Sequence, residues 1–138
     1  MRKRTRSREF ALQVLYQMDI THDDGTASLD NFWRSDPEAV IEEEIKNFTN
    51  DLVRGVADNL RDIDAKIIQY AANWKLERMA VVDRNILRLG CYELVFRDDI
   101  PPKVSINEAV ELAKKYSTQE AAKFVNGILD KVKSEKKR

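Results

Sequence analysis

Residues 41–60 read IEEEIKNFTNDLVRGVADNL, and the apolar positions of this stretch decide the fold class. They recur at steps of four, three, four, four and four residues: Ile41, Ile45, Phe48, Leu52, Val56 and Leu60. This spacing is the period of an amphipathic α-helix, and the acids of the stretch lie on the opposite face. We therefore predict a long helix that begins at Asp36-Pro37, because Asp is a good N-cap and Pro suits the first helical position.

Apolar stripes of the same period lie on both sides of this helix. The other predicted segments are a helix over about 4–18, a polar loop over about 21–35, a separate helix after a break near 59–62, a helix over 79–96 that ends before Pro101-Pro102, and two helices that begin at capping boxes, 105–108 and 117–120. The chain has only 4 Gly and 3 Pro among 138 residues, too few turn residues for a β-sandwich. We predict an all-α fold.

The residue types that carry catalysis and metal binding are scarce. Cys91 and His22 are the single cysteine and histidine, so the chain has neither an internal disulfide nor a paired-imidazole metal site. We expect Cys91 to be a buried, inert thiol, since its neighbours are apolar. No phosphate-binding glycine loop or nucleophile elbow is present, and no apolar run approaches the ~18 residues of a membrane span. The sequence predicts a cytoplasmic protein that is not an enzyme and holds no cofactor or metal.

A formal net charge of zero hides a strong asymmetry along the chain. The first eight residues carry no acid and five bases: Arg2, Lys3, Arg4, Arg6 and Arg8. Residues 19–64 carry 13 acids against 4 bases, and the C-terminus is basic again. This distribution indicates one place that binds a polyanion and perhaps another that binds a basic partner.

The basic N-terminus has two possible forms. An extended arm would put its arginines on one side, whereas a helix would pair Arg4 with Arg8 and send Arg2 and Arg6 elsewhere. Either form offers guanidinium groups to phosphate oxygens and bases. The alternatives are a solvated terminus without function and a membrane-surface helix. Because the arm precedes Phe10, the first apolar position of the stripe, we expect its arginines to be dispensable for folding.

Aromatic side chains beside lysines are candidates for stacking on bases. Tyr116 and Phe124 lie on either side of the second capping box, close in sequence to Lys114, Lys115 and Lys123. For each of the two, a place in the core is an equally good interpretation. We expect most of the other aromatics, Trp33 and Trp74 included, to lie in the core.

Four runs carry a family resemblance: REFALQVLY at 8–16, DRNILR at 83–88 followed by YEL at 92–94, INEAVELAK at 106–114, and KFVNGILD at 123–130. In this order and spacing they resemble the NusB family along nearly the whole chain. The resemblance implies about six or seven helices in two small packed bundles. It divides the chain into an arginine-rich arm (1–8), a helical domain (9–132) and a frayed basic tail (133–138).

The resemblance also implies a function. NusB-like proteins bind the boxA element of nascent ribosomal RNA together with NusE, a small-subunit ribosomal protein, and promote read-through by RNA polymerase. The implied or predicted RNA-binding residues are Lys3, Arg4, Arg6, Arg8, Tyr116, Lys123 and Phe124. Tyr16 and Asp83 match the surface that binds NusE. Two alternatives are an accessory domain that acts with a separate RNA methyltransferase and a helical scaffold that binds only proteins.

Overall fold

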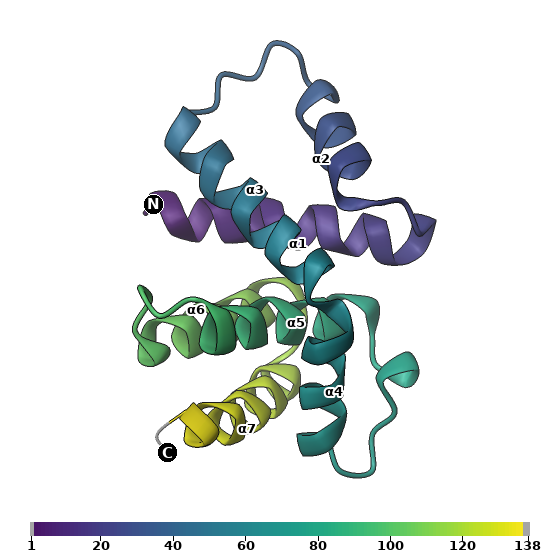
Figure 1. The fold of residues 1–138 in the computed structure, drawn as a ribbon, viewed down its shortest axis with the longest axis vertical. Coiled ribbons are helices and arrows are strands. Elements are labelled where there is room, and N and C mark those ends of the chain that lie inside the picture. The colour runs from purple at the N-terminus through teal and green to yellow at the C-terminus, as the bar shows by residue number, and fades with distance from the viewer. Residues whose placement is uncertain (1, 137–138) are drawn as a thin grey trace. The chain divides into compact units, whose positions relative to one another are not determined.

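Seven α-helices and one short 3₁₀ helix make up the regular structure of residues 2–136, the part of the chain that the computed structural model describes (Figure 1). In chain order they are α1 (Lys3–Thr21), α2 (Gly25–Arg34), α3 (Glu43–Asp58), α4 (Leu60–Tyr70), η1 (Leu76–Arg78), α5 (Val81–Phe96), α6 (Pro102–Tyr116) and α7 (Gln119–Lys136). No strand forms within these residues, and the all-α prediction is confirmed.

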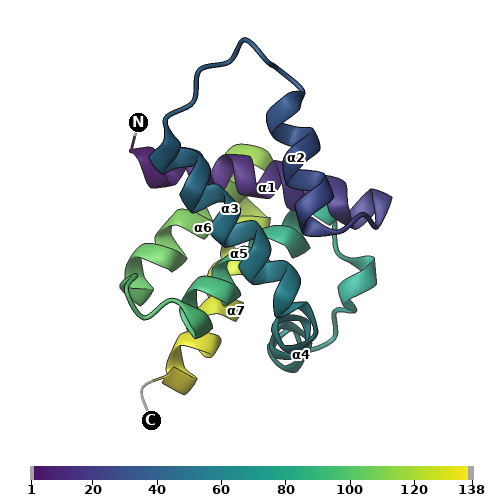
Figure 2. The same cartoon turned by 45° about the horizontal axis from the view of Figure 1, so that its top comes forward.

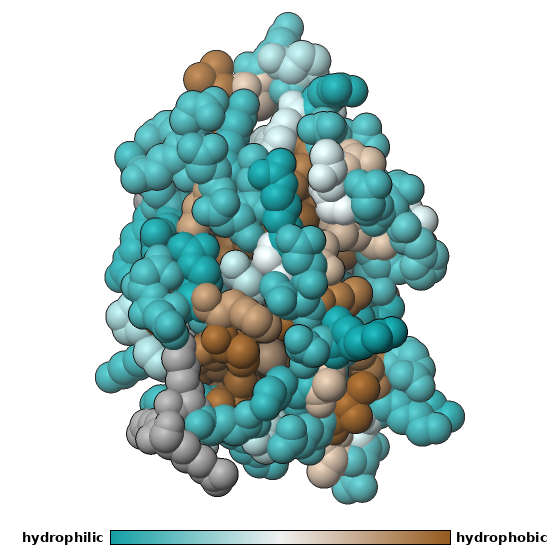
Figure 3. Space-filling view, in the orientation of Figure 1, coloured by the Kyte–Doolittle hydropathy of each residue, from teal (hydrophilic) through white to brown (hydrophobic). Residues whose placement is uncertain are grey.

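The helices form two compact units, Met1–Asp58 with α1 to α3 and Asn59–Arg138 with α4 to α7. The division falls at the predicted break in the long apolar stripe, where Asn59 separates α3 from α4. Hydrophilic side chains predominate on the face shown in Figure 3, and apolar side chains reach it only in separate patches.

In the first unit α1 crosses α3, as both ribbon views show (Figures 1 and 2). The buried face of α3 follows the predicted stripe at Ile45, Phe48, Leu52 and Val56, whereas Ile41 lies before the helix and Leu60 is 38% exposed. The buried face of α1 contains Ala11, Leu12, Val14 and Leu15, and Phe10 is half-buried. Buried hydroxyls join the two helices, because Ser7 Oγ donates to the Ile45 carbonyl (3.0 Å) and Thr49 Oγ1 donates to the carbonyls of Ser7 (3.3 Å) and Ile45 (2.8 Å). These bonds hold the start of α1 against α3.

Two predictions for the first unit are wrong. The predicted polar loop over 21–35 contains α2, whose N-terminus is capped by Asp24 Oδ1 accepting from Ala27 N at 2.8 Å. This helix has ten residues and few buried side chains, among them Leu29, so its apolar stripe is too short to read. The helix expected to begin at Asp36-Pro37 begins at Glu43. Asp36 instead closes a turn, because its backbone carbonyl accepts from Ala39 N at 3.1 Å.

In the second unit α5 packs against α4, α6 and α7 and is buried continuously over residues 85–94. Gly90 lets α7 approach, since a Cβ at this position would lie 2.6 Å from Leu129 Cδ1. Gly127 is also helical, but a Cβ placed on it would meet nothing within 4 Å outside its own turn of α7, so close packing is not the reason for that glycine.

Polar contacts fix the ends of the helices in this unit, and they correct the predicted helix starts. Ser105 does not cap α6, which begins at Pro102; its buried hydroxyl donates to Glu93 Oε1 at 2.9 Å. The second cap is one residue later than expected, because Thr118 Oγ1 accepts from Ala121 N at 2.9 Å. In both cases the serine at the first position of the predicted capping box, Ser105 or Ser117, is not the residue that caps the helix.

The C-terminal helix is longer than the sequence suggested. α7 continues to Lys136, so residues 133–136 of the predicted tail are helical, while Lys137 and Arg138 lie outside the described residues. Glu135 accepts hydrogen bonds from Lys66 Nζ and from the Tyr70 hydroxyl, which anchors the last turn of α7 to α4.

Cys91 is fully buried in α5, as predicted, and burial raises the pKa of its thiol to about 12. Within residues 2–136 no three His, Cys, Asp or Glu side chains gather as a metal site requires. None of the helices in that same range has the length and apolar composition needed to cross a bilayer.

Candidate nucleic-acid interface

The arginine-rich arm is helical, because α1 begins at Lys3. The helical alternative is therefore the correct one, and Arg4 and Arg8 lie on one face. Their guanidinium carbons lie 4.2 Å and 5.5 Å from the centre of the Phe48 ring. Arg6 points elsewhere and lies 5.1 Å from the ring of Phe10, one turn further along α1. Aromatic rings thus hold all three guanidinium groups in place.

Exposure divides the three arginines. Arg4 and Arg6 are exposed, whereas Arg8 is only 3% exposed. The expectation that the arm is dispensable for folding is therefore wrong for Arg8, whose side chain is part of the packing between α1 and α3. The reason is that the buried face of α1 starts with Ser7, three residues before the first apolar position of the stripe. A contact between Arg8 and RNA stays a prediction.

Lys3 forms ion pairs with two acids at the start of α3. Its Nζ lies 2.9 Å from Glu42 Oε2 and 3.0 Å from Glu44 Oε2, and hydrogen bonds to both carboxylates raise its pKa to about 12. The first turn of α1 contains no acid, and Arg2 gives it no side-chain cap. An uncapped, acid-free helix start that carries exposed arginines attracts anions.

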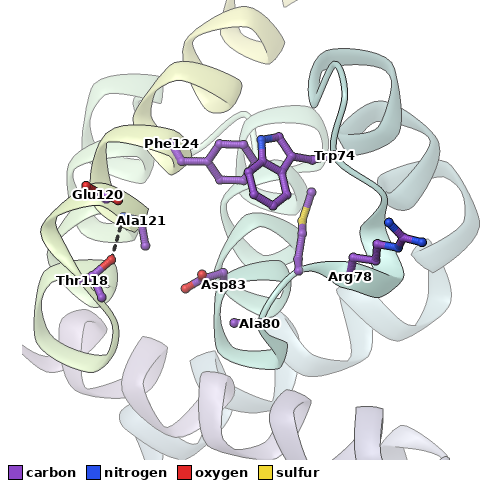
Figure 4. Close-up of a pocket in the computed structure, with 9 residues that line it drawn as sticks. Trp74, Arg78, Ala80, Asp83, Thr118, Glu120, Ala121 and Phe124 are labelled. Carbon is purple, nitrogen blue, oxygen red and sulfur yellow. Dashed lines mark hydrogen bonds between the residues drawn. The ribbon is translucent and has the colours of Figure 1, made fainter.

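The second unit contains a pocket of about 330 Å³ with an aromatic wall (Figure 4). Its lining residues are Trp74, Arg78, Met79, Ala80, Asp83, Thr118, Glu120, Ala121 and Phe124. The rings of Trp74 and Phe124 meet edge to face, with centroids 5.9 Å apart at 65°. The close-up shows these two rings side by side, with Arg78 pointing outward at the edge of the pocket. A pocket of this size suits a small planar group.

Trp74 is 58% exposed, so the prediction that it lies in the core is wrong. Trp74 follows Ile67 by seven residues, which is the spacing of one helical face, but the chain leaves α4 at Ala71 before it reaches Trp74. Asn73 then adopts a left-handed conformation with φ 70°. This turn carries Trp74 out of the core. Sequence reasoning also missed Arg78, which no motif in the sequence marks.

Asp83 supplies an unusual polar group in this pocket. It lies in the first turn of α5, and its Oδ1 is buried with no hydrogen-bond partner among the described residues. Such an atom costs stability unless a bound group donates to it. In Figure 4 Asp83 lies between Thr118 and Ala80. The pocket therefore offers rings for stacking and a carboxylate that can accept a hydrogen bond.

The remaining predicted residues are accessible. Lys123 is exposed on α7 next to Phe124, which is half-buried. Tyr116, at the end of α6, is 41% exposed, and Lys115 Nζ lies 5.3 Å from the centre of its ring. Tyr16 is 42% exposed on α1. The structure thus brings Phe124 and Asp83 together in one pocket and places the arginines of the arm on the rings of Phe48 and Phe10. Tyr16 and Asp83, which the family resemblance assigns to one partner, lie in the first and the second unit respectively.

Comparisons with known proteins agree with one another. The model of the NusB family matches residues 5–134. A transcription antitermination protein NusB from Anaeromyxobacter dehalogenans is 50% identical over 133 residues, which are 96% of this chain and 91% of that protein. The protein of the same name from Thermodesulfovibrio yellowstonii is 43% identical and is matched over 96% of this chain and 93% of its own length.

Solved structures show the same fold. NusB of T. maritima superposes with a TM-score of 0.84 at 39% identity, over 96% of this chain and 91% of that one. A chain from a crystal structure of the antitermination factors NusB and NusE in complex with double-stranded RNA superposes with a TM-score of 0.87 at 28% identity, over 98% of this chain and 98% of that one. The likeness therefore extends over nearly the whole chain in both sequence and structure.

Proposed function

The chain belongs to the NusB family, and we propose that it acts with NusE as an antitermination factor that binds boxA-type RNA in nascent ribosomal transcripts and promotes read-through by RNA polymerase. The family resemblance read from the sequence is confirmed. A structural neighbour has been solved with NusE and RNA, which supports the same partners for this chain. This function needs no catalytic group, and it is exerted where transcripts are made, in the bacterial cytoplasm.

The observation that carries the proposal is the pair of exposed arginines on α1. Arg4 and Arg6 are each held against an aromatic ring, so that less side-chain freedom is lost when they meet a phosphate. Lys3 can contact the RNA only if a phosphate displaces Glu42 and Glu44 from its ammonium group. We assign the arm to backbone phosphates, which position the RNA without reading its sequence.

The aromatic pocket suits the bases. An unpaired base can stack on Trp74 or Phe124, as single-stranded RNA does on aromatic side chains in other proteins. The exposed Lys123 and Arg78 can reach the neighbouring phosphates. Tyr116, exposed beside Lys115, is a second stacking platform in the same unit. The acids in the pocket disfavour a phosphate inside it, which is why we place a base there.

The proposed contacts with NusE are Tyr16 and Asp83. The unpaired Oδ1 of Asp83 would accept a hydrogen bond from this partner, and replacing the carboxylate by an amide tests the assignment. Asp83→Asn keeps the shape of the side chain and is expected to weaken NusE binding more than RNA binding by the chain alone, although Asp83 also lines the pocket that we assign to a base. If the variant instead loses RNA affinity without NusE, Asp83 belongs to the RNA site.

The experiment that tests the whole proposal is a titration of fluorescent boxA-type RNA with the chain alone, with NusE alone and with both. We expect the mixture to bind more tightly than either protein, and a scrambled RNA of equal length to bind more weakly. The absence of RNA binding in all three titrations would support the protein-binding scaffold instead. Equal affinity for boxA and scrambled RNA would contradict the boxA assignment.

A further inference from the structure

The first unit contains a second, smaller pocket, formed by residues of α1 and α2 and by the turns at the two ends of α2. Its volume is about 140 Å³, and its lining residues are Val14, Gln17, Asp23, Ser28, Asn31, Phe32 and Ser35. One water needs only about 10–15 Å³ by the same kind of measure, so the pocket has room for a group of several atoms. None of these residues belongs to the arm or to the aromatic pocket.

Ser28 is the buried polar residue among those that line this pocket. It is 7% exposed, and its Oγ has no hydrogen-bond partner among the described residues. A helical serine usually donates to the carbonyl four residues earlier, as Ser7 does to Lys3 O (3.1 Å) and Ser134 does to Asp130 O (3.0 Å). Ser28 does not make this bond. A buried hydroxyl without a hydrogen-bond partner in the protein costs stability unless another group completes its hydrogen bonds.

The charges around the pocket define what that group can be. Asp23 is the one charged lining residue, and Arg34, at the end of α2, does not line the pocket. Residues 19–30 contain four acids and no lysine or arginine. Asp24 is already used as the cap of α2, whereas Asp23 is among the residues that line the pocket. Side-chain oxygens of Gln17, Asn31 and Ser35 add further acceptors. This surface attracts a cationic donor and repels RNA phosphates.

We propose that the pocket between α1 and α2 binds the cationic end of a lysine or arginine side chain from a protein partner. Asp23 supplies the opposite charge, and Ser28 Oγ accepts one of the donated hydrogens. Val14 and Phe32 give an apolar wall for the methylene part of the inserted side chain, which such residues bury readily. The site is separate from the proposed RNA contacts, so each can fail without the other.

Nuclear magnetic resonance can test this site with the peptides acetyl-Gly-Lys-Gly-amide and acetyl-Gly-Arg-Gly-amide, using acetyl-Gly-Glu-Gly-amide as the acidic control. We expect saturable shifts of backbone amides over residues 23–35 with a basic peptide and none with the acidic one. Asp23→Asn and Ser28→Ala should each weaken the binding by at least about threefold.

Ser28→Ala also separates binding from structure. Because the free hydroxyl has no partner, its removal should leave the melting temperature unchanged or raise it. Ser134→Ala is the matched control, since that helical serine makes the usual local bond and lies far along the sequence. Shifts that do not saturate, that appear equally with the acidic peptide, or that survive unchanged in Asp23→Asn and Ser28→Ala would each overturn the proposal.

Discussion

The salt dependence of RNA binding is the sharpest test of the arm, and the structure says which arginines to change. Arg4→Ala/Arg6→Ala removes two exposed guanidinium groups. Each phosphate contact to single-stranded RNA contributes about 0.7 to the slope of log K against log salt concentration, because condensed counterions are released. The double variant should therefore lower the slope by about 1.4. A triple variant that includes Arg8 is a poorer test, because Arg8 is buried.

The assay is fluorescence anisotropy of boxA-type RNA at several salt concentrations, with thermal unfolding as the control for folding. Loss of the ring contacts of Arg4 and Arg6 should cost no more than about 0.5–1 kcal/mol each, since both residues are exposed. Arg54→Ala provides the matched change of charge, because Arg54 is an exposed arginine on α3 outside the arm. It should leave the slope unaltered.

Three results would refute the reasoning. An unchanged slope in a folded double variant would mean that Arg4 and Arg6 do not touch phosphates, and the arm would then have only a structural role. An equal loss of slope in Arg54→Ala would mean that the effect comes from net charge and not from the arm. A large drop in the melting temperature of the double variant would mean that Arg4 and Arg6 contribute to the packing of the fold, as the buried Arg8 does.

Three further predictions follow from the second unit. Trp74→Ala should lower RNA affinity about five- to hundredfold if a base stacks there, as titration would show, since one stacked base contributes about 1–3 kcal/mol. Gly90→Ala should lower the free energy of unfolding, measured by denaturant titration, by about 1–3 kcal/mol, because the new Cβ would meet Leu129. Gly127→Ala should raise it by about 0.5–1 kcal/mol, because a Cβ at this helical position would meet no neighbouring helix. Cys91 should resist alkylation by iodoacetamide in the native state, and rapid labelling of the folded protein would contradict its burial. The free energy of unfolding should also fall as pH rises from about 9 towards 12, because the Cys91 thiol ionises in that range only in the unfolded chain.

The sequence predicted those features of the fold that depend on long periodic patterns. The stripe from Ile45 to Val56 is buried as expected, and the break at Asn59 divides the two units. The errors lie where the period is short or misleading. The ten residues of α2 have too few buried positions to register, and Trp74 continues the numerical period of α4 after the backbone has left the helix. Periodicity records spacing along the chain and does not show where the backbone turns.

The candidate site shows a different limit, because tertiary contacts decide which charged residues are available. Arg4, Arg6 and Arg8 are equivalent in sequence, yet the hydroxyl bonds from Ser7 and Thr49 draw the start of α1 onto α3 and bury Arg8. Arg8 then lies over Phe48 together with Arg4, so that the exposed guanidinium of Arg4 rests on a packed layer. A basic arm that the sequence describes as a row of similar charges contains, in the folded chain, two exposed arginines on different rings and a buried third that shares the Phe48 ring with Arg4. Substitutions that treat the three as one set would confuse loss of binding with loss of packing.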